Sequence, residues 1–388
     1  MLQFPIYLDY NATTPCDPRV IETMLPFFNH FFGNAASRNH AFGWQAEEAV
    51  SHAREQVSKL IGAEPNEIIF TSGATESDNL ALKGVFEAYS LKGKHIITVS
   101  TEHKAVLDTC KHLEKSGAEI TYLEVGCDGS IDLTKLEAAI TERTILIAIM
   151  IANNETGVLQ PMKQISDIAR KHNVIFFTDA TQAIGKIAVD VNKDGIDLMS
   201  FSAHKMYGPK GVGVLYVRRK NPRVKIVAQM DGGGHERGMR SGTLNVPGIV
   251  GFGKACELCK NEMEEESDRI RKYRDKLENE ILKLEGTSLN GNKENRLPNV
   301  SNISFKYVNG NNLLIDLNKS IAVSSGSACT SALPEPSHVL KALGLEDDLA
   351  NSSIRFAIGR FTTEEEINYA IEFINKTIKD LRETLIDR

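Results

Sequence analysis

Short apolar runs alternate with segments of helix length through the middle of this 388-residue chain. The runs are EIIFT (67–71), HIITVS (95–100), EITYLEV (119–125), TILIAIMIA (144–152), NVIFFTDA (173–180), DLMSFSA (197–203) and GVGVLYVR (211–218). Strands that are separated by helices form βαβ units, and such units build a mostly parallel sheet. The sequence therefore predicts an α/β protein with a seven-stranded, mostly parallel sheet. Ligands of such sheets bind at the carboxyl ends of the strands, so polar residues that follow the runs are the first candidates for a site.

The pattern changes near residue 260, where NEMEEESDRIRKYRDKLENEILKL is long, charged and periodic. Its apolar residues recur every three or four positions, which is typical of a helix with one buried face, so we expect a connecting helix. VSNISFKYV and SSIRFAIG follow as candidate strands, and a final helix is expected from Thr362 onward. The C-terminal part of the chain is therefore predicted to form a smaller α+β domain.

Composition argues against several classes of protein. The net charge of −6 gives no basic field for nucleic acid, and no apolar run approaches the roughly 20 residues that a membrane-spanning helix needs. The stretch MLQFPIYLDYNATTP lacks a basic start followed by a long apolar segment, so we expect no secretory signal. Six irregularly spaced cysteines are too few for a disulfide framework, which indicates reduced thiols and a cytoplasmic location. Cys256 and Cys259 form a lone CxxC on a predicted helix, which we interpret as helix packing, and we expect no metal site.

Two stretches that follow predicted strands could bind charged groups of a ligand. In FTSGATESDN (70–79), a glycine turn leads into a helix start, where free N–H groups and Thr75 could bind an anion. In FFTDATQAIGK (176–186), Asp179 could pair with a cationic group of a ligand, and Gln182 lies three residues further on. Taken singly, each stretch is explained more simply as a helix cap.

A third stretch, MSFSAHKMYGPKG (199–211), places Lys205 beside Ser202 and His204 directly after a predicted strand. A lysine is normally a solvated surface group, but partial desolvation would favour the neutral amine, which can form a Schiff base. The three stretches together offer an anion site, an acid and a lysine in order along one sheet. Pyridoxal 5′-phosphate (PLP) needs these three partners, for its phosphate, its protonated ring nitrogen and its aldehyde.

Four further residues are candidates for the same site. His103 follows a predicted strand and could stack on the ring and shuttle protons, or it could be a helix-start histidine without a role. Asn154 also follows a strand, and the planar guanidinium of Arg355 suits a carboxylate. Cys329 lies in SSGSACTSA (324–332), among Gly, Ala and Ser rather than Leu, Ile and Val. It is either an incidental thiol of a surface loop or a nucleophile on a movable segment.

Long motifs extend from one end of the chain to the other. They include YLDYNATTP, GNAASRNHAFGWQAEEAV, FTSGATESDNLA, TEHKAVLDTC, DATQAIGK, SFSAHKMYGPKG, GGGHERGMRSGT, VSSGSACTSA and SSIRFAIGRFTTEEEI. These motifs resemble those of the cysteine desulfurases of the NifS/IscS type, which are class V aminotransferase-like enzymes, and the resemblance is greatest to the IscS branch. It implies a PLP-dependent transferase fold of type I. We place a large domain at residues 15–262 and a small domain at 1–14 and 263–388, which carries the cysteine loop at about 324–336.

The resemblance also implies roles for the residues around the cofactor ring. Lys205 would hold PLP through a Schiff base, and Asp179 would pair with the ring nitrogen. Gln182 would form a hydrogen bond with the phenolic oxygen, while His103 would stack on the ring and assist proton transfer.

The remaining implied roles concern the phosphate, the substrate and the sulfur. The phosphate-binding residues would be Ala74, Thr75, Ser202, His204 and the partner subunit's Thr243, so a homodimer is expected. Asn154 would contact the cofactor and, with Arg355, hold the substrate carboxylate. Cys329 would be the catalytic cysteine that accepts the sulfur.

The implied reaction removes sulfur from L-cysteine and leaves L-alanine and a persulfide on Cys329. The sulfur would pass to an iron–sulfur scaffold protein (IscU-like) for cluster assembly, and to other acceptors such as those of tRNA thiolation. Members of this branch usually carry a further C-terminal tail for scaffold docking, whereas the sequence given stops at LRETLIDR, so the resemblance bears on catalysis more directly than on docking. Two other functions stay open, namely selenocysteine lyase and a non-catalytic binding partner of a sulfur pathway.

Overall fold

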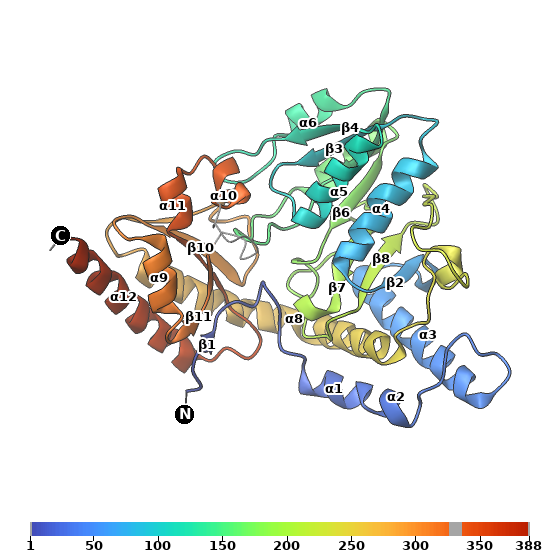
Figure 1. Ribbon diagram of the computed structural model, residues 1–388, viewed down its shortest axis with the longest axis horizontal. Helices are drawn as coiled ribbons and strands as arrows, with labels where there is room; N and C mark the ends of the chain where they lie inside the picture. The colour runs from blue at the N-terminus through green and yellow to red at the C-terminus, as the bar shows by residue number, and fades with distance from the viewer. Residues whose placement is uncertain (1, 326–335, 387–388) are drawn as a thin grey trace.

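The computed structural model describes residues 2–325 and 336–386, and its larger part is built around a seven-stranded sheet (Figure 1). The strands lie in the spatial order β2, β8, β7, β6, β5, β3 and β4. Their bounds are β2 (Ile68–Thr71), β3 (His95–Val99), β4 (Glu119–Leu123), β5 (Thr144–Ala148), β6 (Ile175–Asp179), β7 (Leu198–Ser202) and β8 (Gly213–Val217). Within this sheet β8 is antiparallel to its neighbours β2 and β7, while the other pairs are parallel. The predicted seven-stranded, mostly parallel sheet is confirmed.

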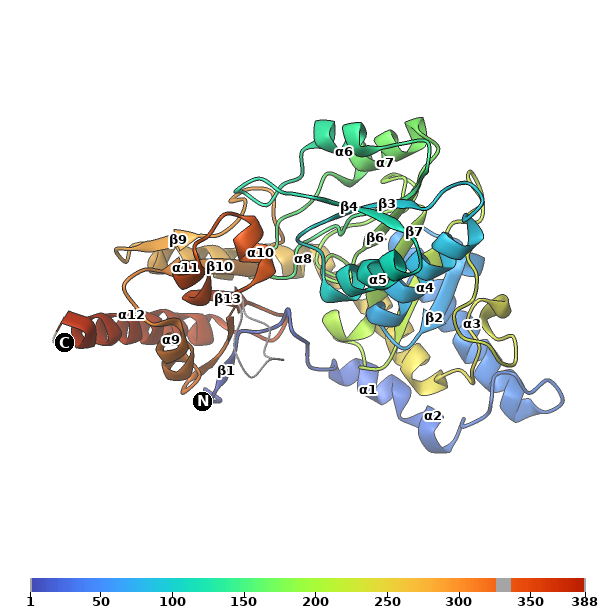
Figure 2. The same ribbon diagram turned by 45° about the horizontal axis from the view of Figure 1, so that its top comes forward.

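Helices cover both faces of this sheet, which explains why its strands are apolar at nearly every position. The helices are α3 (Ala41–Ile61), α4 (Ala74–Ala88), α5 (Lys104–Lys115), α6 (Leu133–Ala139), α7 (Met162–Lys171) and α8 (Val246–Ile281). The helices α4 and α5 share one core with Ile69, whereas α3, α6, α7 and the first part of α8 share another core with Ile68 and Phe70. Figure 2 shows α4 and α5 on one side of the strands and α6 and α7 on the other.

A second, smaller part contains a four-stranded antiparallel sheet in the order β12, β13, β10, β9. A parallel pair of strands, β1 and β11, joins the N-terminal segment to this part of the structure. The elements are β1 (Ile6–Tyr7), β9 (Thr287–Leu289), β10 (Val300–Phe305), α9 (Gly310–Leu317), β11 (Ile321–Ala322), β12 (Ser324–Ser325), α10 (His338–Ala342), α11 (Asp347–Asn351), β13 (Ser353–Ala357) and α12 (Glu364–Ile386). Their apolar residues form a core of their own with the last part of α8, as expected for an α+β unit.

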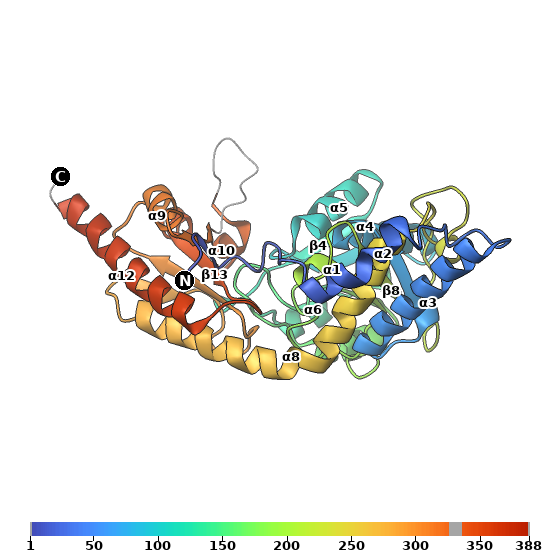
Figure 3. The same cartoon turned by 90° about the horizontal axis from the view of Figure 1, so that it is seen from below.

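The helix α8 passes from the larger part to the smaller one, as Figure 3 shows. Its N-terminal half, including the fully buried Cys256 and Cys259, packs in the core of the large sheet, and its C-terminal half, from Ile270 on, packs in the smaller core. The predicted connecting helix and the packing role of the two cysteines are thus confirmed. The predicted domain boundary between residues 262 and 263 falls inside this helix. No helix of the described residues combines the length and the apolar composition that crossing a membrane requires.

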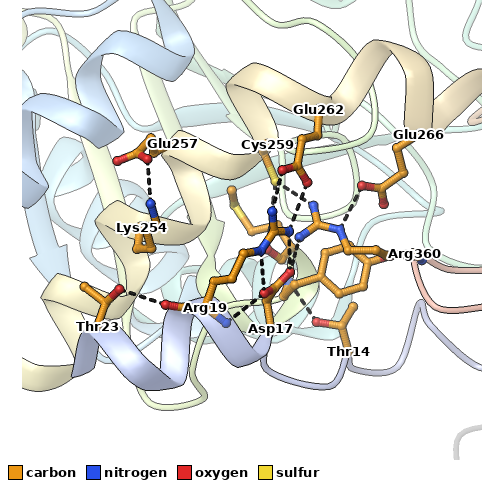
Figure 4. A network of polar contacts seen from close by, with 12 residues as sticks. Thr14, Asp17, Arg19, Thr23, Lys254, Glu257, Cys259, Glu262, Glu266 and Arg360 are labelled. Carbon is orange, nitrogen blue, oxygen red and sulfur yellow. Dashed lines mark hydrogen bonds and ion pairs between the residues drawn. The ribbon is translucent and has the colours of Figure 1, made fainter. Parts of the chain in front are cut away.

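A cluster of charged side chains joins α1 (Pro18–Met24), α8 and the turn after β13 (Figure 4). The Arg360 guanidinium lies 2.8 Å from Asp17 Oδ2 and 2.8 Å from Glu266 Oε2, and it stacks 4.2 Å above the centre of the Tyr207 ring. The Arg360 backbone N–H also donates to the Tyr207 hydroxyl at 2.6 Å. Tyr207 follows Lys205 by two positions, so these contacts fix the turn that presents Lys205.

Candidate active site

A cavity of about 720 Å³ lies where the carboxyl ends of the central strands meet the smaller part of the structure. Strand-end segments of the large sheet form most of its wall, and β13 and the segment after β1 complete it. The predicted site residues that line it are Ala74, Thr75, His103, Asn154, Asp179, Gln182, Ser202, His204, Lys205 and Arg355. Thr243 is exposed and does not line the cavity, and Cys329 lies outside the described residues.

One end of the cavity is suited to an anion. The helix α4 begins directly after Gly73, so the N–H groups of its first turn have no partner within the helix and the positive end of its dipole faces the cavity. The turn can lie this close to the sheet because β8 has a glycine there, since a Cβ on Gly213 would come within 2.6 Å of the Gly73 backbone. Ser202 and Thr75 add hydroxyl groups to the same wall.

His204 belongs to this wall as a neutral ring. Its Nδ1 atom lies 3.1 Å from the Thr13 hydroxyl. Burial, assisted by the positive charges of Lys205, Lys210 and Lys186, lowers the pKa of His204 to about 4. At neutral pH His204 can therefore hydrogen-bond an anion without adding a charge.

Acidic side chains gather at the end of β6. Asp179 is its last residue, is nearly buried, and accepts a hydrogen bond from the Thr181 backbone N–H at 2.8 Å. Asp78 of α4 is fully buried beside it and accepts a hydrogen bond from the Ser200 hydroxyl. Burial and the nearby charge of Asp179 raise the pKa of Asp78, which favours the neutral acid there. Asp179 lies at the same wall, where its carboxylate can pair with a cationic ring nitrogen.

Lys205 lies in a short 3-10 turn, η2 (Ala203–Lys205), that follows β7. Its Nζ atom donates to the backbone oxygens of Asn11 at 2.6 Å and Ala12 at 2.7 Å. Burial and the positive charge of Arg355 lower the pKa of Lys205 to about 8, although Asp179 opposes this effect. With this pKa about a tenth of the amine is neutral and nucleophilic at pH 7, far more than for an ordinary lysine.

Arg355 enters the cavity from β13, where it pairs with Ser324 of β12. Its Nη2 atom lies 2.6 Å from Asp9 Oδ1, and its Nη1 atom donates to the Asn154 backbone oxygen at 3.1 Å. The other oxygen of Asp9 accepts a hydrogen bond from the Ser324 hydroxyl at 2.8 Å. The substrate-binding candidates thus lie next to the strand that leads into the segment of Cys329.

His103 caps the start of α5 at the exposed rim of the cavity. Its Nδ1 atom accepts a hydrogen bond from the Ala105 backbone N–H at 3.2 Å. A neutral ring therefore carries its proton on Nε2. Both sequence interpretations of this residue, a helix cap and a member of the site, agree with its position.

The segment after β1 supplies a part of the site to which the sequence reasoning assigned no role. The Asn11 backbone oxygen accepts hydrogen bonds from Lys205 Nζ and from Gln182 Nε2, the latter at 3.0 Å. The Asn11 side chain donates to the Asn154 backbone oxygen and accepts from Asn299. The polar NATT stretch after YLDY was visible in the sequence, but spacing does not tell which cavity an N-terminal segment enters.

Several buried polar atoms of the cavity wall have no hydrogen-bond partner among the described residues. They are Asp78 Oδ2, Thr181 Oγ1 and Arg355 Nε. Buried polar atoms normally have partners, so unpaired ones indicate a site built for a polar ligand. Across the described residues, no group of three or more His, Cys, Asp or Glu side chains is placed to hold a metal ion. An anion site, a carboxylate and a partly neutral lysine in one cavity fit PLP.

Comparisons with known proteins agree with this geometry. Residues 6–369 match the family described as aminotransferase class-V. The chain is 59% identical to the cysteine desulfurase IscS of Pectobacterium carotovorum over 384 residues, which cover 98% of this chain and 95% of that protein. The IscS of Photorhabdus laumondii shows the same identity and coverage.

Solved structures give the same result. A NifS-like protein superposes with a TM-score of 0.91 at 40% identity, over 97% of this chain and 100% of that one. The structure of SspA in complex with cysteine superposes with a TM-score of 0.81 at 37% identity, over 92% of this chain and 100% of that one. Enzymes of the matched family use PLP as their cofactor. The chain therefore belongs to the class V aminotransferase family and, within it, to the cysteine desulfurases of the IscS type.

Proposed function

We propose that the cavity residues act together in the desulfurase reaction, in which L-cysteine loses its sulfur to Cys329 and leaves as L-alanine. The observation that carries this proposal is the meeting of Lys205, Asp179 and Arg355 in one cavity. In the overall balance, the Cys329 thiol and L-cysteine give a Cys329 persulfide and L-alanine. No other oxidant or reductant is needed.

We assign the binding of the substrate carboxylate to Arg355 and Asn154. Arg355 offers a planar, permanently charged donor set, and its Nε atom has no partner among the described residues. The ion pair with Asp9 holds the guanidinium in place before substrate arrives. A carboxylate at this point orients the rest of the amino acid toward Lys205.

The cofactor is PLP, and the assignment of its contacts is our proposal. When bound, it withdraws electrons from the substrate Cα. Lys205 holds its aldehyde, Asp179 keeps its ring nitrogen protonated, and Gln182 donates to its phenolic oxygen. The phosphate is held by Ala74, Thr75, Ser202, His204 and the partner subunit's Thr243.

Proton transfer at the substrate is assigned to two bases of the cavity. Lys205 Nζ and His103 take up and return the proton at the substrate Cα. Lys205 suits this task because its pKa of about 8 is close to the operating pH. His103 suits it because its ring lies at the cavity rim and can exchange protons with water.

The sulfur acceptor is Cys329, which we place within reach of the substrate from the position of the chain around it. Ser325, the last described residue before it, pairs with Ile354, the neighbour of Arg355 in β13. Cys329 follows four residues later, and so few residues span at most about 14 Å. On the far side, the Ser337 hydroxyl donates to Glu155, which is adjacent to Asn154. Both flanks of the segment thus contact immediate neighbours of the cavity residues Arg355 and Asn154.

We infer a homodimer from an exposed apolar surface on the larger part. Its residues are Leu25, Phe28, Phe32, Phe42 and Trp44. Apolar patches of this kind mark interaction surfaces, and Thr243 is exposed rather than part of its own cavity. A monomeric mass in solution at the assay concentration would contradict this inference.

The sulfur of Cys329 is proposed to pass to an iron–sulfur scaffold protein and to acceptors of tRNA thiolation, in the cytoplasm. We also infer two domains, 15–262 and 1–14 with 263–388, which the separate apolar cores support.

The transfer of sulfur to a scaffold protein is tested by incubating the persulfide-loaded enzyme with a purified scaffold protein, because labelled sulfur must then appear on the scaffold. Failure of that transfer would leave the desulfurase reaction itself unaffected.

The proposed reaction is tested by product analysis. Purified protein with L-cysteine and a reducing thiol is expected to release alanine and sulfide in equal amounts, without any 2-oxo acid. Turnover with selenocysteine alone would indicate a lyase, and a requirement for a 2-oxo acid would indicate an aminotransferase. A protein that binds PLP but converts none of these substrates would contradict an enzymatic role.

The lowered pKa of Lys205 should be visible in how the rate of covalent PLP binding to the apoprotein depends on pH. Only the neutral amine attacks an aldehyde, so the rate at which the apoprotein binds PLP covalently should rise about tenfold per pH unit below pH 8 and level off above it. With Nα-acetyl-lysine as a control, the rate of reaction with PLP should continue to rise up to pH 10, near the ordinary lysine pKa of about 10.4. Stopped-flow absorbance measures both rates. A protein whose rate climbs in parallel with the free amine would contradict the desolvated lysine.

A further inference from the structure

A second lysine is connected to the active site by a chain of hydrogen bonds. Lys186 Nζ donates to Gln182 Oε1 at 2.8 Å, and Gln182 Nε2 donates to the Asn11 backbone oxygen at 3.0 Å. The same oxygen accepts a hydrogen bond from Lys205 Nζ at 2.6 Å. The two lysines are therefore the two ends of one chain that passes through the Gln182 carboxamide.

This chain determines which way the Gln182 carboxamide points. A backbone oxygen can only accept, so Asn11 must face the nitrogen of the carboxamide. Lys186 donates to the oxygen of the carboxamide, and in its ammonium form it can do nothing else. The nitrogen has a second hydrogen besides the one used by Asn11, and Gln182 lines the cavity. That hydrogen is available to an acceptor of a ligand bound there.

We propose that Lys186 is a positioning residue, which holds the Gln182 carboxamide so that its N–H side faces the phenolic oxygen of the bound cofactor. This inference rests on the proposed role of Gln182. Without Lys186 the carboxamide oxygen would lose its buried donor, and the amide could rotate about its last bond. The donor to the cofactor oxygen would then be present for only part of the time.

The surroundings of Lys186 make this hydrogen bond its main polar contact. Its side chain is partly buried, and burial together with the positive charges of Lys205 and Arg355 lowers its pKa to about 7, against the smaller opposing effects of Cys259 and Glu266. Both protonation states of a lysine amine carry N–H donors, so the bond to Gln182 persists through this titration. The Lys186 backbone oxygen is held separately by the Ser267 hydroxyl of α8, at 2.6 Å, so a change of side chain leaves that anchor in place.

The test compares Lys186→Met, which keeps the length of the chain but removes the donor, with Lys186→Arg, which keeps a donor. The readout is the pH titration of the absorbance of bound PLP, with the dissociation constant of PLP as a second measurement. In Lys186→Met the titration midpoint is expected to rise by about one pH unit, because the anionic oxygen loses a stabilising donor, and PLP should bind about tenfold more weakly. Lys186→Arg should recover most of both effects.

Two controls distinguish positioning of Gln182 from a general effect of removing a lysine charge. Lys193→Met removes a largely exposed lysine from the same region and should change neither readout. In a double-mutant cycle, adding Lys186→Met to Gln182→Ala should move the midpoint no further, because Lys186 is argued to act through Gln182. Additive shifts, or an unchanged midpoint in Lys186→Met, would overturn the inference. Thermal unfolding of each apoprotein shows whether a variant has lost its fold. If Lys186→Met has done so, Lys186→Leu, which also lacks a donor, takes its place with the same expected shift.

The outcome is distinct from a failure of the proposed function. If PLP attaches to Lys205 and the midpoint in Lys186→Met does not move, the desulfurase mechanism stands and only the role of Lys186 is lost. If the wild-type protein does not hold PLP at Lys205 at all, the proposed function fails first.

Discussion

The variant Lys205→Ala is expected to bind no PLP covalently and to lose desulfurase activity by more than about 10³-fold, because it lacks both the anchoring amine and a base at the substrate Cα. Lys205 is the amine that the strand end of β7 delivers into the cavity, with its Nζ atom fixed on the Asn11 and Ala12 oxygens. Borohydride reduction of the wild-type holoenzyme, followed by peptide mapping, should place the label on Lys205.

Lys193→Ala is the matched control, since that side chain is 84% exposed, and it should keep both label and activity. A label on another lysine of the wild-type protein would show that the assignment of the cavity residues is wrong.

The variant Cys329→Ser is expected to retain PLP and to bind L-cysteine, but to form alanine more than about 10³-fold more slowly. Sulfur transfer needs a thiolate, and the serine hydroxyl is a poor nucleophile toward sulfur at neutral pH. The cofactor contacts come from other segments, so the absorbance change on addition of L-cysteine should persist. Alanine quantified over time measures the loss.

Cys127→Ser tests whether any accessible thiol suffices. Cys127 is exposed and lies outside the cavity lining, so its loss should change the rate of alanine release by less than about twofold. Undiminished turnover in Cys329→Ser would show that Cys329 takes no part in the mechanism.

The large sheet was predictable because each of its strands carries an apolar run, which burial on both faces demands. The residues at which strands and helices begin and end are harder to predict from the sequence. The run 144–152 reads as one strand, whereas β5 ends at Ala148 and the chain then continues beside β6, where the Ile149 N–H donates to the Phe177 oxygen.

The helix α8 begins at Val246, well before the charged stretch that predicted it. Its first turns are enclosed by the core and therefore have no polar face. A helix is recognised from its sequence by the contrast between a polar and an apolar face, and this contrast is missing there. A Cβ on Gly253 would come within 2.6 Å of Ala53 Cα, so this glycine, which weakens the helix signal, is the one that admits α3.

The strand-end candidates came together in the cavity because the carboxyl ends of parallel strands meet at one edge of the sheet. The sequence assigns no role to Asp9 and Asn11, since they come from the segment after β1, which pairs with β11, and contact Arg355 and Lys205 only in the folded chain. The sequence does not reveal the contact of Lys186 with Gln182 for a different reason. A lysine four residues after a glutamine is typical of a solvated helix face, and only the fold turns it toward Gln182.

The position of α8 in the chain has a consequence for synthesis. All the strands of the large sheet are complete at Val217, yet part of one face of that sheet is covered by α8, which the ribosome makes later. The helices α3, α6 and α7 of this face are already made when β8 emerges, so the nascent chain would expose only the part of the apolar face that α8 covers. The core on this face of the large sheet is therefore completed only after α8 has left the exit tunnel.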